Sequence, residues 1–474
     1  MTDRTDVLVV GAGPTGLALG ICLTRQGVDA LVVERADALF PGSRGKGVQP
    51  RTMEVFDDLG VVEAVLGAGG PYPVGMIWQD GVRAGEHRMF DPPEEGEDSS
   101  YAEPWMVPQW RTQEILFARL TELGGRVAFG REAVGLDQDA DGVTVSFADG
   151  GAIRARYAVA ADGGRSAVRR ALGVGMTGEP VDPAPMLVAD VTIDGLDRGN
   201  WHIFPPADGS GDFLAVCPLA GTDTFQVTAR FAGDTVVDVS PDAVCKVVAA
   251  RSHLAAEDVT EVRWASDFRP RAALADRFRA GRVLLAGDAA HIHSPAGGQG
   301  LNTSVQDAYN LGWKLGAVLR GGAPESLVHT YEEERLPVAA EMLGLSTGVH
   351  RGEIRRGAVT RQLGLGYRDS SLTLETRAAP DGTLRAGDRA PDGEIRRASG
   401  GARRLFDVFR GPHWTLLTVG TDTPLPESPF PVVRVAEHPA YGTGVFLVRP
   451  DGYIGWAGDT AAGLDGYAGR LRLC

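Results

Sequence analysis

The stretch from Asp6 to Glu34, DVLVVGAGPTGLALGICLTRQGVDALVVE, decides the fold of this chain. Its unbroken apolar run over 6–10 predicts a strand that is buried on both faces. The turn GAGPTG follows, and the spacing of later apolar residues predicts a helix that Gly27 caps. A second strand over 30–33 then ends at Glu34. The stretch therefore predicts a βαβ unit that binds a dinucleotide.

Each glycine of this turn has a physical role. Gly11 allows the tight turn, Gly13 lets a pyrophosphate approach the backbone, and Gly16 lets the helix pack on the strand. The amides that begin the helix would face the phosphates. Glu34 can accept hydrogen bonds from ribose hydroxyls, which favours FAD or NAD over a cofactor with a 2′-phosphate. The unit by itself does not separate FAD from NAD.

Two further segments combine an apolar strand with a turn that contains glycine and aspartate. Residues 156–161 predict a strand ending in Asp162-Gly163, with Ser166 as the cap of a helix over 167–172. Residues 282–286 predict another strand, which ends in Gly287-Asp288. A loop then leads to a helix whose apolar stripe is formed by Leu301, Val305, Ala308, Leu311 and Leu315.

Composition excludes several classes of protein. The 474 residues suggest two or three domains, and the net charge of −15 disfavours nucleic acid and anionic membranes as partners. The four cysteines form no CxxC pair, so neither a disulfide framework nor a zinc cluster is indicated. His291 and His293 lack further ligands at suitable spacing, and we expect no metal. No signal peptide or membrane span is recognisable, which predicts a cytoplasmic protein.

Three motifs resemble the single-component FAD-dependent aromatic hydroxylases, the family of para-hydroxybenzoate hydroxylase and phenol hydroxylase. They are GAGPTG over 11–16, AADGGRSAVRRALG over 160–173, and LLAGDAAHIHSPAGGQGLNTSVQDAYNLGWKL over 284–315. The segments SRGKGVQPRTMEVFDDLG (43–60) and VPQWRTQEIL (107–116) also look like family segments. The likeness is strongest to the bacterial aromatic-polyketide hydroxylases.

The resemblance implies an α/β fold, α+β overall, in which two domains are interleaved. A Rossmann-like FAD-binding domain would take residues 1–70, 104–174 and 269–375. An antiparallel-sheet substrate domain would take 71–103 and 175–268, where AVCPLA and TFQVTARF alternate like strands. Residues 384–474 resemble a thioredoxin-like tail without CxxC, in which 404–409 and 414–419 look strand-like. We expect this tail to have a structural role or to form the contact of a homodimer.

The resemblance also implies a set of residues that bind the cofactor. Asp288 would bind the ribitol of FAD, Arg44 the pyrophosphate, and Arg111 with Gln109 the ribose or phosphates. Asp162 with Gly163 would shape the turn where FAD and the nicotinamide meet, supported by Arg165. The full predicted set is Gly11, Gly13, Pro14, Thr15, Gly16, Glu34, Arg35, Arg44, Gln109, Arg111, Asp162, Gly163, Gly287, Asp288, Pro295, Gly298, Gly300, Leu301 and Asn302.

The implied reaction is the hydroxylation of a phenolic, polycyclic aromatic compound with molecular oxygen. NADPH or NADH would bind transiently and reduce the flavin, and a flavin C4a-hydroperoxide would transfer the oxygen. Pro295, Gly297 and Gly298 are the predicted catalytic residues, because their backbone would form a dry face around the ring. No residue identifies itself as a base for the phenol. Candidate pocket residues, for each of which core packing is the commoner role, are Trp78, Trp201, Phe204, Phe213, Phe225, Arg230 and Trp264.

Other functions remain open on the sequence. Related flavoproteins carry out Baeyer-Villiger oxidation or inactivate aromatic antibiotics, and the residues do not separate these reactions from hydroxylation. A catalytically idle flavin-binding assembly subunit is the alternative of another class. A flavin halogenase is disfavoured, because the stretch from Gly199 to Pro205 lacks the second tryptophan of GWxWxIP. Two-Rossmann flavoproteins are disfavoured, because the chain carries one dinucleotide fingerprint.

Overall fold

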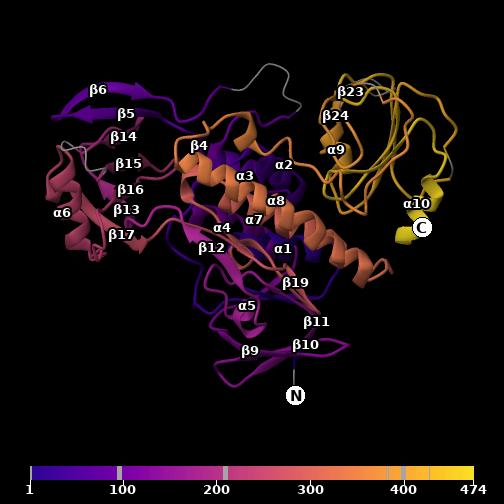
Figure 1. The fold of residues 1–474 in the computed structure, drawn as a ribbon, viewed down its shortest axis with the longest axis horizontal. Coiled ribbons are helices and arrows are strands. Elements are labelled where there is room, and N and C mark those ends of the chain that lie inside the picture. Colours follow the sequence, from indigo (N-terminus) through magenta and orange to yellow (C-terminus); the bar gives the residue numbers. More distant parts are fainter. Residues whose placement is uncertain are drawn as a thin grey trace.

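A parallel sheet forms the centre of the molecule (Figure 1). The computed structural model describes residues 3–92, 99–206, 212–380, 382, 384–396, 402–425 and 427–473. The parallel strands lie in the order β8-β2-β1-β11-β20, so the first strand in the chain is central, as in doubly wound dinucleotide folds. Their bounds are β1 Asp3–Val10, β2 Ala30–Val33, β8 Arg126–Ala128, β11 Ala152–Ala160 and β20 Val283–Leu285.

Helices cover this sheet because its strands are apolar on both faces. Val7, Leu8 and Val9 of β1 have no exposed surface. Helix α1 (Pro14–Arg25) packs between α7 (Gly300–Leu319) and α4 (Gln109–Glu122). A Cβ at Gly312 would lie 2.4 Å from that of Cys22, so only glycine allows α7 this close to α1. The predicted βαβ unit is confirmed.

A second, largely antiparallel sheet lies beside the first, as the sequence predicted (Figure 1). Helix α6 (Pro241–Arg251) packs on one face, and the other face is turned toward the parallel-sheet lobe. In the order β17-β13-β16-β15-β14-β5-β6, only β5 and β14 pair in parallel. The bounds are β5 Val74–Gln79, β6 Val82–His87, β13 Met186–Ile193, β14 Asn200–Phe204, β15 Leu214–Pro218, β16 Phe225–Arg230 and β17 Val259–Phe268.

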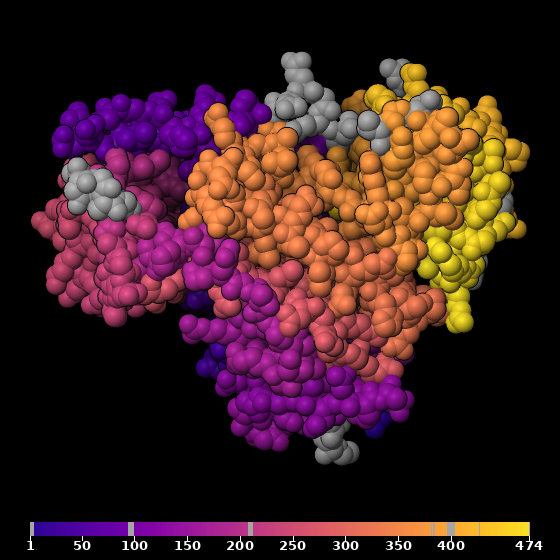
Figure 2. Space-filling view, viewed as in Figure 1, coloured from indigo at the N-terminus to yellow at the C-terminus, as the bar shows by residue number. Residues whose placement is uncertain are grey.

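The C-terminal domain has the strand order of a thioredoxin core, β26-β25-β27-β28. Strand β25 (Thr415–Val419) is parallel to β26 (Val432–Val435) and antiparallel to β27 (Gly444–Val448), and β28 (Ile454–Gly458) continues the sheet. Helix α10 (Leu464–Leu471) follows β28. Figure 2 shows this domain at one end of the molecule and the antiparallel sheet at the other.

The strand-like prediction for 404–409 is wrong. Residues Leu405–Phe409 form helix α9, and the side chain of Asp407 accepts a hydrogen bond of 3.2 Å from the Arg404 amide at its start. Leu405 and Phe409, one helical turn apart, are the buried pair. A five-residue stretch with four apolar residues fits a strand or a helix equally well, and the cap decides between them.

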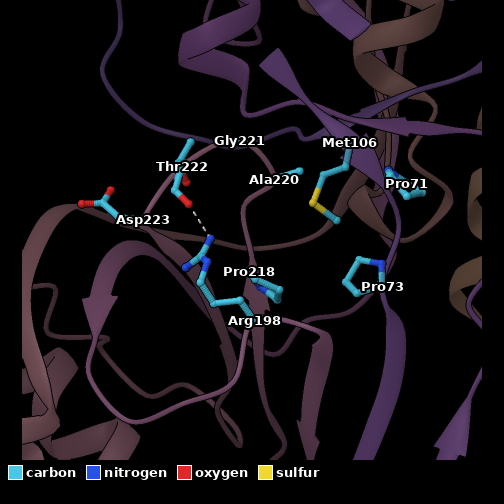
Figure 3. A pocket seen from close by; sticks show the side chains of 9 residues that line it. All are labelled: Pro71, Pro73, Met106, Arg198, Pro218, Ala220, Gly221, Thr222 and Asp223. Atoms are coloured by element: carbon cyan, nitrogen blue, oxygen red, sulfur yellow. Dashed lines mark hydrogen bonds between the residues drawn. The ribbon is translucent and has the colours of Figure 1, made fainter. Parts of the chain in front are cut away.

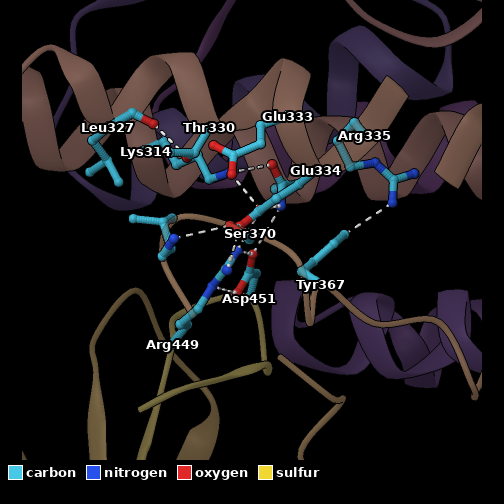
Figure 4. A network of polar contacts seen from close by, with 12 residues as sticks. Lys314, Leu327, Thr330, Glu333, Glu334, Arg335, Tyr367, Ser370, Arg449 and Asp451 are labelled. Carbon is cyan, nitrogen blue, oxygen red and sulfur yellow. Dashed lines mark hydrogen bonds and ion pairs between the residues drawn. The ribbon is translucent and has the colours of Figure 1, made fainter. Parts of the chain in front are cut away.

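A buried ionic cluster anchors the C-terminal domain (Figure 4). Arg449, just after β27, binds Glu334 on helix α8 (Ser326–His350) and Asp451, and Lys314 on α7 donates to Glu334 at 2.6 Å. All four side chains are at most 1% exposed. Among the helices of the described ranges, none is long and apolar enough to cross a bilayer.

Candidate functional site

The first glycine turn is shaped by close backbone contacts. Gly11 has φ +112°, and a Cβ there would lie 2.3 Å from the Ala161 carbonyl oxygen. A Cβ at Gly16 would lie 1.9 Å from the Gly11 carbonyl oxygen. Gly13, which caps α1, has no protein atom within 4 Å of where its Cβ would be. The turn is thus tight against the protein at two glycines and open at the third, where a pyrophosphate would approach.

Glu34 lies at the end of β2 and supports this turn. Its carboxylate accepts hydrogen bonds from the amides of Ala12, at 2.9 Å, and Ala36, at 3.1 Å. A carboxylate has about four acceptor positions, so two hydrogen bonds leave room for ribose hydroxyls. Glu34 therefore both fixes the glycine turn and remains able to bind a ribose.

The other two turns meet the first one. A Cβ at Gly287 would lie 2.5 Å from the Thr15 hydroxyl, and Gly11 contacts Ala161 at the end of β11. Oδ2 of Asp162 accepts from the amides of Ala167, at 2.8 Å, and Val168, and so caps helix α5 (Ala167–Ala171). Oδ1 of Asp162 is buried without a hydrogen-bond partner. The three motifs form one site, in which this oxygen is available to a ligand.

Asp288 lies in a recess of the protein. It keeps an exposed surface, yet the surrounding protein desolvates it and raises the pKa of its carboxyl, while the charges of His291 and Arg44 oppose that rise. Its side chain has no hydrogen-bond partner among the described residues. Arg44 is exposed, and its guanidinium lies 5.1 Å from the centre of the Phe40 ring. Arg44 is thus close enough for its charge to act on Asp288, and the roles of both residues toward a cofactor stay predictions.

The turn before α7 joins several predicted residues. Pro295–Gly297 form a 3-10 turn, and Gly298 follows with φ +62°. The side-chain nitrogen of Asn302 donates to the carbonyls of Gly298, at 2.8 Å, and Gly47, at 2.9 Å. Its side-chain oxygen accepts from the Gln49 backbone amide. The positive end of α7 therefore opens beside the segment 45–49.

Asp307 on α7 fixes the turn Gly287-Asp288. Its carboxylate accepts from the Gly287 amide at 3.0 Å, lies 2.6 Å from His291 Nε2 and accepts from Arg335 at 2.8 Å. Burial by itself would raise the pKa of Asp307, but the charges of His291 and Arg335 hold it below its usual value. His291 and His293 bind each other at 2.9 Å. Within the described ranges no three metal-ligating side chains come together.

Some predicted residues lie apart from this convergence. Arg35 and Arg165 are exposed. Arg111 pairs with Glu114 at 2.8 Å on the surface of α4, whereas Gln109 accepts from the Gly45 amide at 3.1 Å. The roles of Arg35, Arg111 and Arg165 toward a cofactor stay predictions.

The residues present fit FAD. Gly13 leaves room for phosphates, Glu34 and Asp288 have free acceptor positions, and Asp162 has an orphaned oxygen. The start of α1 has no side-chain cap, so its amides are free for an anion. These groups would hold the dinucleotide, and the turn 295–300 would lie against its flavin.

The antiparallel sheet turns only part of the predicted pocket set toward this site. Trp78, Phe204 and Phe225 pack in the apolar core under α6. Trp201 and Trp264 lie on the other face, where Trp264 contacts Phe40 at 5.2 Å between ring centres. Phe213 is half-buried just before β15, and Arg230 on β16 is engaged by Asp182 at 2.9 Å.

An open pocket of about 440 Å³ lies between the two lobes (Figure 3). Arg198 projects into it and donates to the Thr222 carbonyl at 2.7 Å. Met106 contributes from β7 (Trp105–Met106), which pairs with β3 (Gly47–Val48). None of the predicted cofactor residues lines this pocket, so it belongs to the antiparallel-sheet side. Its lining is Pro71, Pro73, Met106, Arg198, Pro218, Ala220, Gly221, Thr222 and Asp223.

Sequence reasoning missed a polar group at the seam of the two lobes. Lys46 donates to Gln226 on β16, and Asp190 on β13 is buried beside them. Lys46 stands inside the segment 43–60 and is one of three lysines in the chain. The rarity of lysine could have drawn attention to Lys46. Its neighbours Gln226 and Asp190 could not be predicted, because they lie on strands far away in the sequence.

Fold and site together fit a flavoprotein in which a dinucleotide-binding fold lies beside a second, antiparallel sheet. Residues 4–346 match the FAD binding domain family and residues 383–472 the aromatic-ring hydroxylase C-terminal family. The chain therefore belongs to the FAD-dependent aromatic-ring hydroxylases, as the motifs predicted.

Characterised relatives agree with this assignment. The chain is 46% identical to a flavin-dependent monooxygenase of Mycobacteroides abscessus over 95% of this chain and 96% of the relative. It is 34% identical to the 12-dehydrotetracycline 5-monooxygenase/anhydrotetracycline 6-monooxygenase of Streptomyces rimosus over 99% and 98%. The solved ternary complex of aklavinone-11 hydroxylase with FAD and aklavinone is 30% identical, covers 100% of both chains and has a TM-score of 0.84. The protein is an FAD-dependent monooxygenase.

Proposed function

We propose that the protein hydroxylates a phenolic, polycyclic aromatic compound of the polyketide type, with NADPH or NADH as transient reductant. The observation that carries this proposal is a group of three rings at the antiparallel sheet, formed by Trp201 on β14 and by Tyr72 and Phe90 in the connections that flank β5 and β6. Tyr72 lies 4.8 Å from Phe90 and 6.2 Å from Trp201, between ring centres, and the Tyr72 and Trp201 rings are stacked. Such faces bind flat aromatic molecules. Relatives named for anhydrotetracycline and aklavinone support the same substrate class.

The chain's own residues would bind and orient the cofactor and the substrate and would exclude water. FAD, when bound, supplies the oxygen-transfer chemistry. The positive end of α7 would face the flavin, and the turn Pro295–Gly298 would lie along it. Arg356 donates to the Ala296 carbonyl at 2.9 Å and so fixes that turn. A fixed, dry turn would favour transfer of oxygen to the substrate over release of hydrogen peroxide.

The test combines the FAD-loaded protein with NADPH, oxygen and a panel of anthraquinones and naphthacenes. We expect NADPH oxidation to rise with at least one compound, and its product to gain one oxygen atom while retaining all its rings. NADPH oxidation that rises with no compound, together with no product, would contradict the proposal and favour the idle flavin-binding subunit.

Inactivation of an antibiotic is a second candidate. The chain is 39% identical to the rifampicin monooxygenase of Streptomyces venezuelae over 71% of this chain and 69% of the relative. Rifampicin and tetracycline therefore belong in the panel. Loss of their antibacterial activity on incubation would favour this function, and ring expansion by one oxygen would indicate Baeyer-Villiger oxidation.

A further inference from the structure

The backbone on both sides of Lys46 is held by predicted cofactor residues. The Gly45 amide donates to Gln109 at 3.1 Å, and the Gly47 carbonyl accepts from Asn302 at 2.9 Å. The Lys46 carbonyl accepts from the Val107 amide at 2.8 Å. The segment 45–47 is therefore fixed beside the start of α7. From there the Lys46 side chain extends away from the cofactor lobe.

The side chain reaches the antiparallel sheet. Lys46 Nζ donates to Gln226 Oε1 and lies 4.5 Å from the centre of the Trp201 ring. Gln226 alternates with Phe225 and Val227, which are in the core under α6, so Gln226 points to the opposite face. The Lys46 amine thus lies at the seam between the cofactor lobe and the sheet.

The surroundings of Lys46 are in part open to solvent. Lys46, Tyr72, Trp201 and Arg356 are each only partly buried, although protein desolvates the amine. The Trp201 ring beside the amine stacks with Tyr72 at 6.2 Å between centres. A flat aromatic molecule on these rings would present its edge to Nζ.

One polar atom beside this amine lacks a partner. The Trp201 indole nitrogen is buried without a hydrogen bond, whereas Asp190 lies against the hydroxyl and the amide of Ser43. Native proteins leave few buried polar atoms unsatisfied, and those that remain mark functional positions or missing ligands. The indole nitrogen is thus available to a polar ligand.

The charges that face Lys46 come from several elements. Burial lowers the pKa of Lys46, and the charge of Arg356 adds to this, whereas Cys217 on β15 and Asp190 on β13 oppose it. Burial raises the pKa of Asp190 to about 6 and that of Cys217 to about 11, so Cys217 stays a thiol. Desolvation also raises the pKa of Tyr72. Asp190 and Cys217 are buried, whereas Lys46 keeps exposed surface, so Lys46 is the one of these groups that can both reach a substrate and take its proton.

We propose that Lys46 takes the proton of a ring hydroxyl of the substrate and then holds the phenolate as its counter-ion, an inference that rests on the proposed hydroxylation of a phenolic compound. The O–H bond breaks, an N–H bond forms at Nζ, and the electron pair stays on the phenolate oxygen. The phenolate ring is richer in electrons than the phenol, so it reacts faster with an electrophilic oxygen. Lys46 thereby selects substrates that carry an acidic hydroxyl at one edge.

The test uses the FAD-loaded protein without NADPH and 1,8-dihydroxyanthraquinone, whose absorbance moves to longer wavelength on ionisation. With the unmodified protein we expect the bound probe to ionise at a pH lower than the free probe by about one unit or more. Lys46→Met should bind the probe as the neutral phenol and at least about tenfold more weakly. Lys246→Met, at the exposed lysine on α6, is the matched control and should leave the spectrum unchanged.

Lys46→Arg separates the proton acceptor from the counter-ion. Calorimetry at pH 8.5 in buffers of different ionisation enthalpy counts the protons released on binding. A lysine that accepts the proton gives no net release, whereas arginine, already protonated, should release one proton per probe. Equal release by both proteins would overturn the role as base. FAD occupancy of each variant shows whether the cofactor lobe is intact.

The outcomes separate this inference from the proposed function. A phenolate band in Lys46→Met equal to that of the unmodified protein overturns the inference, while hydroxylation of phenols by the unmodified protein would still stand. If the unmodified protein neither binds nor oxidises any phenol of the panel, the proposed function fails and this inference fails with it.

Discussion

Arg449 and Glu334 are joined by two parallel hydrogen bonds, of 2.7 and 2.9 Å, across the junction between the C-terminal domain and helix α8. Both side chains are completely buried. Burial would raise the pKa of Glu334, but the charges of Arg449 and Lys314 hold it far below its usual value. The domains are therefore held together by a desolvated ion cluster, and its removal has measurable consequences.

Glu334→Gln should destabilise the protein strongly. The substitution leaves Arg449 and Lys314 buried without their carboxylate, which costs about 3–5 kcal/mol. Urea unfolding measures the change. Glu122→Gln is the control, since Glu122 pairs with Arg119 on the surface and is 68% exposed, and it should cost less than about 1 kcal/mol. Similar losses in the two variants would contradict the role of the cluster.

The same carboxylate should make stability depend on pH in the acid range. A carboxyl whose pKa is depressed on folding stabilises the protein above its unfolded pKa of about 4.3 and loses that contribution as pH falls. The melting temperature should thus fall on acidification below about pH 4, and less steeply in Glu334→Gln. Parallel curves for the two proteins would show that Glu334 does not carry this dependence.

Two glycine substitutions should separate cofactor binding from folding. Gly16→Ala places a Cβ 1.9 Å from the Gly11 carbonyl oxygen, so it should lower the melting temperature of the FAD-free protein. Gly13→Ala meets no protein atom within 4 Å, so it should fold normally and lose FAD affinity, by about tenfold or more. Fluorescence titration with FAD and thermal melting give the two readouts. Unchanged FAD affinity in Gly13→Ala would show that the pyrophosphate does not bind at Gly13.

Asp288→Asn should weaken FAD binding without harming the FAD-free fold. Desolvation raises the pKa of the Asp288 carboxyl, which means that folding opposes its charge at neutral pH. The uncharged side chain of the variant should therefore leave the melting temperature of the FAD-free protein equal to, or higher than, that of the unmodified protein. Loss of a charged acceptor should reduce FAD affinity about tenfold or more. A lower melting temperature with normal FAD affinity would assign Asp288 a structural role.

Thiol reagents should distinguish the cysteines. Burial raises the pKa of Cys22 to about 12 and that of Cys217 to about 11, whereas Cys245 is only partly buried. Cys474 lies outside the described residues, so the test uses Cys474→Ser. At pH 8 one thiol per chain should react quickly and the other two only after unfolding. Rapid modification of Cys22 in the folded protein would contradict its burial.

Local signals carried the correct predictions. The strand, glycine turn and helix of 6–34 lie next to one another in the chain, and each is fixed by residue types that tolerate few alternatives. Ser166 was predicted as a cap and accepts from the Arg169 amide at 2.9 Å. Helix α9 was missed because its five residues, four of them apolar, are too few to show a clear period. Arg111 was assigned to the cofactor by resemblance to the family. In the structure it pairs with Glu114 on the exposed surface of α4.

The seam between the lobes could not be predicted in the same way. Lys46, Asp190 and Gln226 come from a loop, β13 and β16, and only the pairing of Asp190 with Gln226 across adjacent strands brings the last two together. Strands β5 and β6 lie in the segment 71–103, in which no individual strand was predicted, and β5 joins the sheet through parallel pairing with β14. Such contacts depend on the register of strands far apart in the chain.

The pairing of β5 with β14 has a consequence for synthesis on the ribosome. Strand β5 must wait for Asn200–Phe204, and the parallel sheet is completed only by Val283–Leu285. A nascent chain shorter than this carries open apolar edges in both lobes, which are sites of aggregation. Neither lobe is thus a separable gene fragment, and a truncated message yields insoluble polypeptide rather than a smaller flavoprotein.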